Sequence, residues 1–528
     1  MRILLVEPQY RKARAKQPGS PPPKPGAPRD DNTLWYPPLG LMKLSRFHKM
    51  RHHDVKFVSG CDPSLFEETG LFGPGKRWDR VYITTLFTYH FDKIVETINF
   101  YKEALGGTTS RVFVGGIMAS LMPKAIFEAT GVQPKCGVLT SPEQIGLSGS
   151  DNIDRLPPDY SPDLLDPTKY AINDTYHGYA TRGCKNKCPW CGVPMLEPEY
   201  VPYIDIKPMI YALREEHGDK ATLKLMDNNV LNSDQLEQIV DDLLELGYGR
   251  GKLTEKTKKQ RVVDFNQGLD ATHITDRTMR LLAKLHIKPM RIAFDRLAEK
   301  KDYVRALRLA KEHGVTEFSN YMLYNFKDTP HDLYERLIVN IELNEEWVRA
   351  IPGRMAGKIY SYPMRYAPIQ EEKGDRANRK RDAVRNVKTE SHDWLKEPVW
   401  TRRFIRNIEI MKGAAHGAIS PTPTLARRTL GETFEEFVAN LYMPEELLRN
   451  RNQHEKKVYP HEPRRKPGSG KVEEFRAFVQ GLLAKQDGRF RTFHEAATSN
   501  SSHTIKEALK TIEDKEIHKW LKLYLRRR

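Results

Sequence analysis

Three cysteines close together in the middle of the chain are its clearest candidates for chemistry. Cys184, Cys188 and Cys191 lie in the segment GYATRGCKNKCPWCGVP with the spacing Cys-x3-Cys-x2-Cys. Thiolates are soft ligands that suit iron–sulfur clusters or zinc. Three of them can hold three irons of a [4Fe-4S] cluster and leave the fourth iron open, whereas a structural zinc site needs four protein ligands. Cys136 or His177 would have to complete a zinc site, so we favour the cluster.

Length and composition exclude several other classes of protein. The 528 residues predict two to four domains, and 39% hydrophobic with 29% charged residues is typical of a globular chain with a large polar surface. No apolar run is long enough to span a bilayer, and the first residues lack the pattern of a signal peptide. Five cysteines are too few for a disulfide scaffold. We therefore expect a cytoplasmic protein with no membrane partner.

The first 147 residues alternate between apolar strands and amphipathic helices. Strands are predicted at 2–7, 54–60, 79–87 and 111–116, and helices at 37–53, 91–107 and 123–131. A proline-rich loop occupies 16–31. This alternation predicts a doubly wound parallel α/β domain. Its ligand site would lie where the strands end, near Glu7, Thr84, Thr85, Gly115 and Gly116.

A second alternating series follows a proline-rich linker at 148–172. Strands are predicted at 177–183, 222–227, 262–268, 290–295, 317–326 and 358–364, with helices at 233–247, 275–286, 301–313 and 330–347. Six strands separated by helices fit a partial β/α barrel over 173–370. The cysteine segment would then lie on the loop after the first barrel strand.

The last part of the chain, 371–528, is basic and mainly helical. It carries a net charge of +11 out of +17, and helices are predicted at 392–412, 431–449, 471–486 and 504–525. Basic and aromatic residues alternate in two stretches, where arginines would pair with phosphates and rings would stack on bases: Trp400, Arg402, Arg403, Phe404 and Arg406, then Trp520, Tyr524, Arg526, Arg527 and Arg528. The alternative, which we favour, is that these helices are amphipathic and pack on the barrel.

The cysteine spacing, the aromatic Trp190 before the third cysteine and the position after a first barrel strand together resemble the radical S-adenosylmethionine (SAM) enzymes. The resemblance implies that SAM chelates the open iron. Its reductive cleavage would give methionine and a 5′-deoxyadenosyl radical, which modifies an unactivated carbon of an unknown substrate. It also implies an electron donor such as flavodoxin or ferredoxin. The alternative is a nucleic-acid-binding protein, or an RNA-modifying enzyme, whose cysteines form a structural metal site.

The same resemblance implies SAM contacts at the ends of later barrel strands. The expected contacts, with Trp190, are Asp227 and Asn228 for the amino group, Asn266 and Gln267 for the ribose and carboxylate, and Tyr324 and Asn325 for the adenine. The segment LMDNNV replaces the Gly-Gly-Glu-like turn that is usual in the family, which leaves the individual roles of its residues open. Each residue has a plain structural alternative, a polar side chain at a strand end.

The N-terminal domain resembles the cobalamin-binding-type domain that precedes the barrel in one radical SAM subgroup. The segments WYPPLGLMKLSRF and VFVGGIMASLMPKAI carry this resemblance, which implies a cobalamin-dependent methyl transfer as one form of the reaction. The Asp-x-His-x-x-Gly motif that supplies a histidine to cobalt is missing. His48, His52 and His53 lie in or after a helix, where we expect surface residues. Cobalamin therefore binds without a protein ligand, or the domain has lost it. Methylthiolation, which needs three further cysteines in this domain, is excluded.

Overall fold

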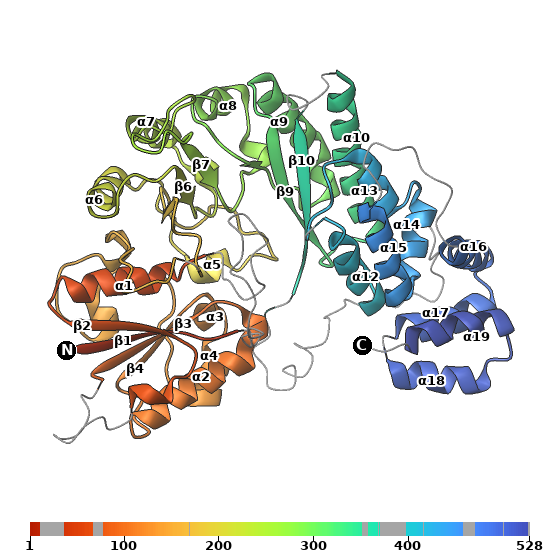
Figure 1. Cartoon of the computed structure of the whole chain (residues 1–528), viewed down its shortest axis with the longest axis horizontal. Coiled ribbons are helices and arrows are strands. Elements are labelled where there is room, and N and C mark those ends of the chain that lie inside the picture. Colours follow the sequence, from red (N-terminus) through yellow and green to blue (C-terminus); the bar gives the residue numbers. More distant parts are fainter. Residues whose placement is uncertain are drawn as a thin grey trace, which may run out of the picture. The chain divides into compact units, whose positions relative to one another are not determined.

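The computed structural model describes residues 1–10, 36–66, 78–167, 169–350, 357–367, 369, 398–415, 417–457, 470–499 and 501–525. The chain is a mixed α/β protein with parallel sheets and many helices (Figure 1). It divides into two compact units. The first comprises Met1–Gln267, Lys284–His286 and Ile369–Lys380, and the second comprises Gly268–Ala283, Ile287–Pro368 and Arg381–Arg528.

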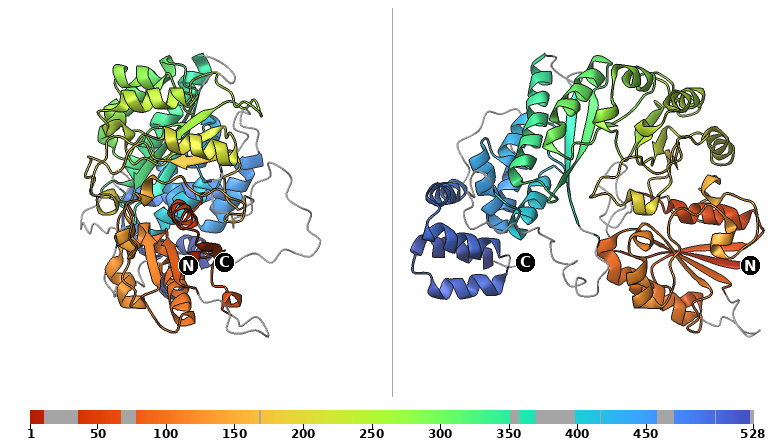
Figure 2. Two further views of the ribbon diagram at one scale, coloured as in Figure 1. Left: turned by 90° about the vertical axis from the view of Figure 1, so that its left-hand side faces the viewer. Right: turned by 180° about the vertical axis from the view of Figure 1, so that it is seen from behind.

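The N-terminal part of the first unit is the predicted doubly wound parallel sheet. Its strands are β1 (Arg2–Glu7), β2 (Asp54–Ser59), β3 (Arg80–Thr85) and β4 (Val112–Gly116), in the order β2-β1-β3-β4. Helix α1 (Leu39–Lys49) covers one face, and α2 (Phe91–Ala104), α3 (Ile117–Leu121) and α4 (Pro123–Thr130) cover the other (Figures 1 and 2). Central strand β1 is a continuous apolar run because both of its faces are buried. The strand order reverses between β1 and β3, so the topological switch point lies there.

One histidine of this domain differs from the expected surface position. His48 on α1 is fully buried. Its Nε2 lies 3.1 Å from the Tyr82 hydroxyl on β3, and its Nδ1 lies 2.9 Å from Nδ1 of His53. Burial, followed by the charge of His53, lowers the pKa of His48 to about 3, so its ring stays neutral. His48 lies on the side of α1 that packs against the sheet, so it is a core residue.

A second parallel sheet in the first unit carries the cysteine loop. Its strands β5 (Thr175–Gly178), β6 (Thr222–Leu225) and β7 (Val262–Phe265) run in that order. Helices α5 (Val193–Leu196), α6 (Lys207–His217) and α7 (Leu236–Glu245) accompany them. The predicted strand at 177–183 is wrong in its position, since β5 starts two residues earlier and ends at Gly178. After it, the backbone N–H groups of Ala180 and Thr181 donate to the Asp227 carboxylate instead of to a neighbouring strand.

The second unit contains another three-stranded parallel sheet. Its strands are β8 (Met290–Arg291), β9 (Glu317–Tyr324) and β10 (Lys358–Arg365), in the order β10-β9-β8, with α8 (Asp276–Leu282), α9 (Lys300–Glu312) and α10 (Pro330–Ala350). The six strands predicted for residues 173–370 therefore exist, but they divide between two sheets in two units. A single barrel over that range stays a prediction.

The C-terminal region is helical, as predicted. It contains α12 (Arg402–Lys412), α13 (Pro423–Leu430), α14 (Phe434–Tyr442), α15 (Glu445–Lys457), α16 (Gly470–Lys485), α17 (Gly488–Thr498), α18 (Ser502–Thr511) and α19 (Lys515–Leu521). The predicted helix at 431–449 is two helices, because Pro444 interrupts it. The predicted helix at 504–525 is also divided, since Asp514 caps the start of α19. Within the described residues, no helix combines the length and apolar character needed to cross a membrane.

Candidate functional site

The three cysteines lie on one loop that leaves the carboxyl end of β5. Cys184 and Cys188 are half-buried and Cys191 is exposed. The backbone turns tightly between the second and third cysteines, where the Cys191 N–H donates to the Cys188 carbonyl at 3.0 Å. Trp190 lies half-buried within this turn. The loop therefore presents three thiols from one short stretch at the end of a parallel strand, where ligand sites of α/β proteins gather.

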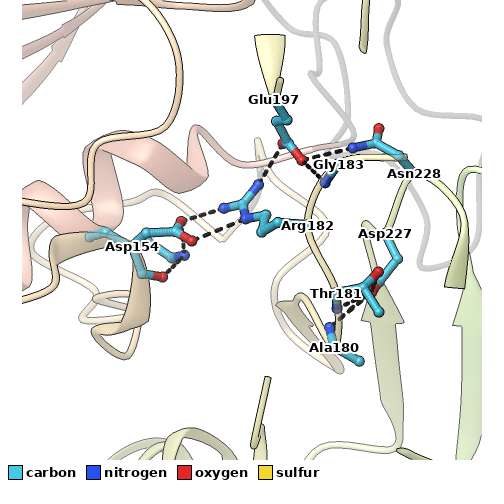
Figure 3. A network of polar contacts seen from close by, with 9 residues as sticks. Asp154, Ala180, Thr181, Arg182, Gly183, Glu197, Asp227 and Asn228 are labelled. Carbon is cyan, nitrogen blue, oxygen red and sulfur yellow. Dashed lines mark hydrogen bonds and ion pairs between the residues drawn. The ribbon is translucent and has the colours of Figure 1, made fainter. Parts of the chain in front are cut away.

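Asp227, which follows β6, holds the first residues of this loop. Its carboxylate accepts hydrogen bonds from the backbone N–H of Ala180 at 3.0 Å, from the N–H of Thr181, and from the Thr181 hydroxyl at 2.6 Å (Figure 3). Asp227 is buried, and burial raises its pKa to about 6 in spite of these hydrogen bonds. The structure thus gives Asp227 a positioning role in the loop, and its predicted contact with SAM stays a prediction.

A buried ionic network holds Arg182, which lies two residues before Cys184, in place. Nε of Arg182 donates to Asp154 at 3.0 Å and its Nη1 donates to Glu197 at 2.8 Å (Figure 3). The Arg182 guanidinium also lies 3.3 Å from the ring centroid of Tyr179. Asp154 comes from the linker and Glu197 follows α5, so one side chain joins the linker to both ends of the cysteine loop.

Helix α1 extends this network into the N-terminal domain. The Lys43 ammonium donates to Asp154 at 2.9 Å, and burial lowers the pKa of Lys43 to about 8. Burial alone would raise the pKa of Asp154, but Lys43 and Arg182 beside it hold that pKa below its ordinary value. Glu197 also accepts from the Gly183 N–H at 2.6 Å and from Asn228 Nδ2 at 2.8 Å. The predicted residue Asn228 is therefore part of this network.

Gly183 is a position where the loop requires glycine. Its φ is +74°, and a Cβ there would lie 2.4 Å from the backbone carbonyl oxygen of Glu199. The close approach arises because Arg182 pairs with Val201 in a short antiparallel bridge. The bridge and the ion pairs together fix where the chain enters the cysteine segment.

Hydrogen bonds to the sulfurs support a cluster at this loop. The Asn186 N–H donates to Cys184 Sγ at 3.3 Å, and the Val193 N–H donates to Cys191 Sγ at 3.5 Å. The Cys184 thiol lies 3.2 Å from Asn232 Oδ1, which also accepts from the Lys185 N–H at 3.0 Å. Backbone N–H donors around sulfur stabilise thiolates and tune the potential of an iron–sulfur cluster.

The chemistry of the donor set fits a [4Fe-4S] cluster. In the part of the chain that the structure describes, no three His, Cys, Asp or Glu side chains converge closely enough to bind one metal ion. A cubane has a different requirement, because each thiolate binds its own iron. Three thiols on one loop, with backbone N–H groups directed at two of the sulfurs, meet that requirement in donor type and number.

The other predicted SAM contacts of the first unit lie at the end of β7. Asn266 is buried, and its Oδ1 accepts from the Tyr36 hydroxyl at 2.8 Å. Gln267 is exposed. The structure thus brings Asp227 and Asn228 together with the cysteine loop, whereas Asn266 is joined to Tyr36, a residue that the sequence reasoning did not select.

The predicted adenine contacts lie in the second unit, at the end of β9. Tyr324 is buried, its hydroxyl donates to Glu409 on α12 at 2.7 Å, and its ring lies 5.1 Å from that of Trp400. Its carbonyl accepts from the Tyr366 N–H at 2.8 Å. Asn325 is buried with φ +65°, a left-handed conformation that asparagine tolerates. This turn is held in place by the C-terminal helices, and its role with adenine stays a prediction.

Polar and aromatic groups surround the switch point of the N-terminal sheet. Glu7 at the end of β1 is buried and accepts from the Tyr170 hydroxyl, and burial raises the pKa of Glu7 to about 7. The ring of Tyr10 stacks on His90 at 4.8 Å. At the end of β4, a Cβ on Gly116 would lie 2.5 Å from the Thr85 carbonyl oxygen. The predicted strand ends thus form a closely packed edge.

The proposed nucleic-acid residues of the C-terminal region are mostly packing residues. Trp400, Phe404 and Trp520 are all buried, so they cannot stack on bases. Tyr524 donates to the backbone carbonyl of Tyr442. Arg403 is also buried, and Arg406 pairs with Glu445 at 3.2 Å. These residues are thus buried as amphipathic helices require, and Arg402 is partly buried in α12 beside them. Trp520 packs on Phe475 of α16, so packing of these helices on a barrel stays a prediction. The three arginines at 526–528 lie outside the described residues.

The sequence reasoning missed Lys43, Asp154, Arg182 and Glu197. These residues are far apart in the sequence, and no motif joins them. The one available signal was a set of charged residues next to the cysteine segment, Arg182 before it and Glu197 after it.

No protein-family model matches the chain, and a search of curated proteins finds no match either. Solved structures give weak matches. The radical SAM methyltransferase TsrM from Kitasatospora setae, with cobalamin and a [4Fe-4S] cluster bound, is 13% identical with a TM-score of 0.45, over 67% of this chain and 79% of that chain. SuiB from Streptococcus suis, bound to SAM, is 15% identical with a TM-score of 0.25, over 38% and 40%.

TsrM is described as a radical SAM methyltransferase, and SuiB was solved with SAM bound. At these TM-scores the matches carry no argument about activity. The functional conclusion below therefore depends on the residues of this chain.

Proposed function

We propose that this chain is a radical SAM enzyme in which Cys184, Cys188 and Cys191 hold a [4Fe-4S] cluster. The observation that carries the proposal is the cysteine loop itself. Three thiols stand at the carboxyl end of a parallel strand, two of the sulfurs accept backbone N–H groups, and a buried ionic network fixes the loop. A structural zinc site needs four protein ligands, and within the described residues no group of three metal-binding side chains converges on one ion.

The bound cluster would supply the electron that cleaves SAM to methionine and a 5′-deoxyadenosyl radical. The residues of the chain prepare that chemistry. The Asn186 and Val193 N–H groups stabilise negative charge on two sulfurs. Asp227 anchors the start of the loop, while Arg182 and Glu197 hold both of its ends. A fixed loop keeps the three thiolates in one arrangement before any ligand arrives.

The contacts with SAM belong to the same proposal. We assign Trp190, Asp227, Asn228, Asn266, Gln267, Tyr324 and Asn325 to this cofactor. Apart from Trp190 on the cysteine loop, these residues stand at the carboxyl ends of strands β6, β7 and β9. We also expect a flavodoxin or ferredoxin as electron donor and a cytoplasmic location.

Cobalamin binding and methyl transfer form the finer part of the proposal. The strand order β2-β1-β3-β4 supports it, because doubly wound parallel sheets bind ligands at the switch point, which lies here between β1 and β3. Tyr10, Phe87 and His90 form an aromatic cluster beside this edge, with centroid distances of 4.8 to 6.0 Å. Flat aromatic faces suit a large planar ring. We propose that cobalamin, when present, is held there without the usual histidine motif.

Iron and sulfide analysis tests the proposed cluster. After anaerobic reconstitution, the full-length chain should contain about four irons and four sulfides. A variant with Cys184, Cys188 and Cys191 changed to Ala should lose them together with the visible absorbance. The matched control changes Cys61 and Cys136 to Ala, and it should retain both. One zinc per chain, with no iron, would show that the loop is a structural metal site.

A further inference from the structure

A row of polar side chains crosses the sheet β5-β6-β7. His177 on β5 is in register with Lys224 on β6, which is in register with Asp264 on β7. Residues in register in a parallel sheet point to the same face, and Asn266 lies two positions beyond Asp264 along the chain. The apolar face of the sheet is formed by the alternate residues Tyr176, Leu223, Leu225, Val263 and Phe265, all buried.

Tyr36 covers this polar row. Its ring centroid lies 5.2 Å from the Lys224 ammonium, and it meets the His177 ring edge-on at 6.4 Å. The Tyr36 hydroxyl donates to Asn266 at 2.8 Å. Tyr36 itself is 40% exposed. Among the described residues, the partly exposed ring of Tyr36 covers the row, and a bound molecule can contact or displace it.

His177 has a donor that no described residue satisfies. Its side chain is only 2% exposed. The Tyr160 hydroxyl accepts from the His177 backbone N–H at 2.8 Å and lies 3.1 Å from Nδ1 of the same residue. Among the described residues, Nδ1 is the one acceptor within reach of the Tyr160 hydroxyl hydrogen, so we assign the ring proton to Nε2. Within the described residues Nε2 has no hydrogen-bond partner. A buried donor without an acceptor is costly and calls for an explanation.

The charges around His177 favour an anion. Lys224 pairs with Asp264 at 3.0 Å and has two further N–H groups to donate. The buried Lys220 lies 4.4 Å and 4.7 Å from the rings of Tyr160 and Tyr176. The charged groups that act on the His177 ring are these two lysines and Asp264, which leaves one net positive charge around that ring. Burial, and then these two lysines, lower the pKa of His177 to about 3, so the imidazole is a neutral donor at physiological pH.

We propose that this row is a binding site for the carboxylate of an organic molecule. The Lys224 ammonium and the His177 Nε2–H donate to its oxygens, and the Tyr36 ring packs against its hydrocarbon part. One net positive charge matches a carboxylate better than a doubly charged phosphate. The identity of the ligand depends on the proposed function, because the carboxylate belongs either to the molecule that is modified or to SAM. Binding itself does not require the cluster.

Saturation-transfer NMR on the full-length protein without its cluster tests the site. The probe is acetate, with neutral acetamide as its control. Lys224→Met should weaken acetate binding about tenfold, as expected for the loss of a charge-assisted hydrogen bond, and His177→Phe should weaken it several-fold. Lys224→Arg keeps the charge and should retain most of the binding. Lys124→Met, on an exposed face of α4, should change nothing.

A second variant does not depend on the buried residues. Tyr36→Ala should lower the affinity for hexanoate several-fold and leave that for acetate nearly unchanged, because only the longer chain reaches the ring. Equal binding of acetate by wild type and Lys224→Met, or equal binding of acetamide and acetate, would overturn the inference.

Equilibrium dialysis of SAM then identifies the source of the carboxylate. If Lys224→Met lowers the affinity for SAM by a factor similar to that for acetate, the site binds the carboxylate of SAM. If the affinity for SAM is unchanged, the site binds another substrate. Failure of the proposed function would appear separately, as missing iron and sulfide in protein that still binds acetate.

Discussion

Replacing Arg182 with Met should loosen the cysteine loop more than any surface change of equal size. The substitution keeps a long apolar side chain but removes the hydrogen bonds to Asp154 and Glu197. The side chains of Arg182, Asp154 and Glu197 are 11%, 8% and 14% exposed, so the ion pairs are largely shielded from solvent. Breaking a buried pair costs about 3–5 kcal/mol, since it leaves a charge without its partner.

The expected loss lies at the lower end of that range. Lys43 still neutralises Asp154 at 2.9 Å, and the Gly183 N–H still donates to Glu197 at 2.6 Å. We therefore expect a decrease of about 3 kcal/mol in the free energy of unfolding. The matched control is Arg46→Met. Its partner Glu216 is 39% exposed, so the control should cost no more than about 1 kcal/mol.

Urea titration followed by tryptophan fluorescence measures the stability difference, and iron analysis after reconstitution measures the effect on the site. Arg182→Met should unfold at a lower urea concentration and retain less iron than Arg46→Met. If the two variants unfold alike and hold equal amounts of iron, the network does not position the loop.

Two further predictions concern backbone and pH. Gly183→Ala should reduce iron content sharply because its Cβ would meet the Glu199 carbonyl at 2.4 Å, whereas Gly131→Ala, with φ +72° in open space, should cost only about 1–2 kcal/mol and leave the iron unchanged; equal effects would contradict the close approach. Glu7→Gln should become more stable relative to wild type as the pH rises from about 4.5 to 7. The raised pKa means that the folded state binds the extra proton in this window, so wild-type stability falls with rising pH, by about 3 kcal/mol in total. Urea midpoints across this pH range check the second prediction, and an unchanged difference between the two proteins would refute it.

Much of the fold follows from local patterns in the sequence. The apolar runs of β1 and β4 and the periodic helices between them identify the doubly wound domain. The cysteine spacing likewise selects the loop after β5. The ends of strands and helices were harder to predict where a side chain, and not a backbone carbonyl, accepts the hydrogen bond of a backbone N–H. Strand β5 ends at Gly178 because Asp227, far along the chain, accepts hydrogen bonds from the backbone N–H groups of Ala180 and Thr181.

The polar row and the ionic network could not be predicted from the sequence. His177 and Lys224 are 47 positions apart and Lys224 and Asp264 are 40 apart, so only the register of three parallel strands places them side by side. Lys43 and Arg182 meet at one aspartate because α1 packs against the linker, and no periodicity encodes that contact. Side chains brought together by tertiary packing leave no local pattern.

Release of 5′-deoxyadenosine tests the central claim most directly. The reconstituted chain is reduced anaerobically with dithionite, given SAM, and its products are separated by chromatography. We expect 5′-deoxyadenosine and methionine from the wild type, and neither from the variant with Cys184, Cys188 and Cys191 changed to Ala. S-adenosylhomocysteine alone, or 5′-deoxyadenosine from the triple variant at the wild-type rate, would contradict the assignment of radical chemistry to this loop.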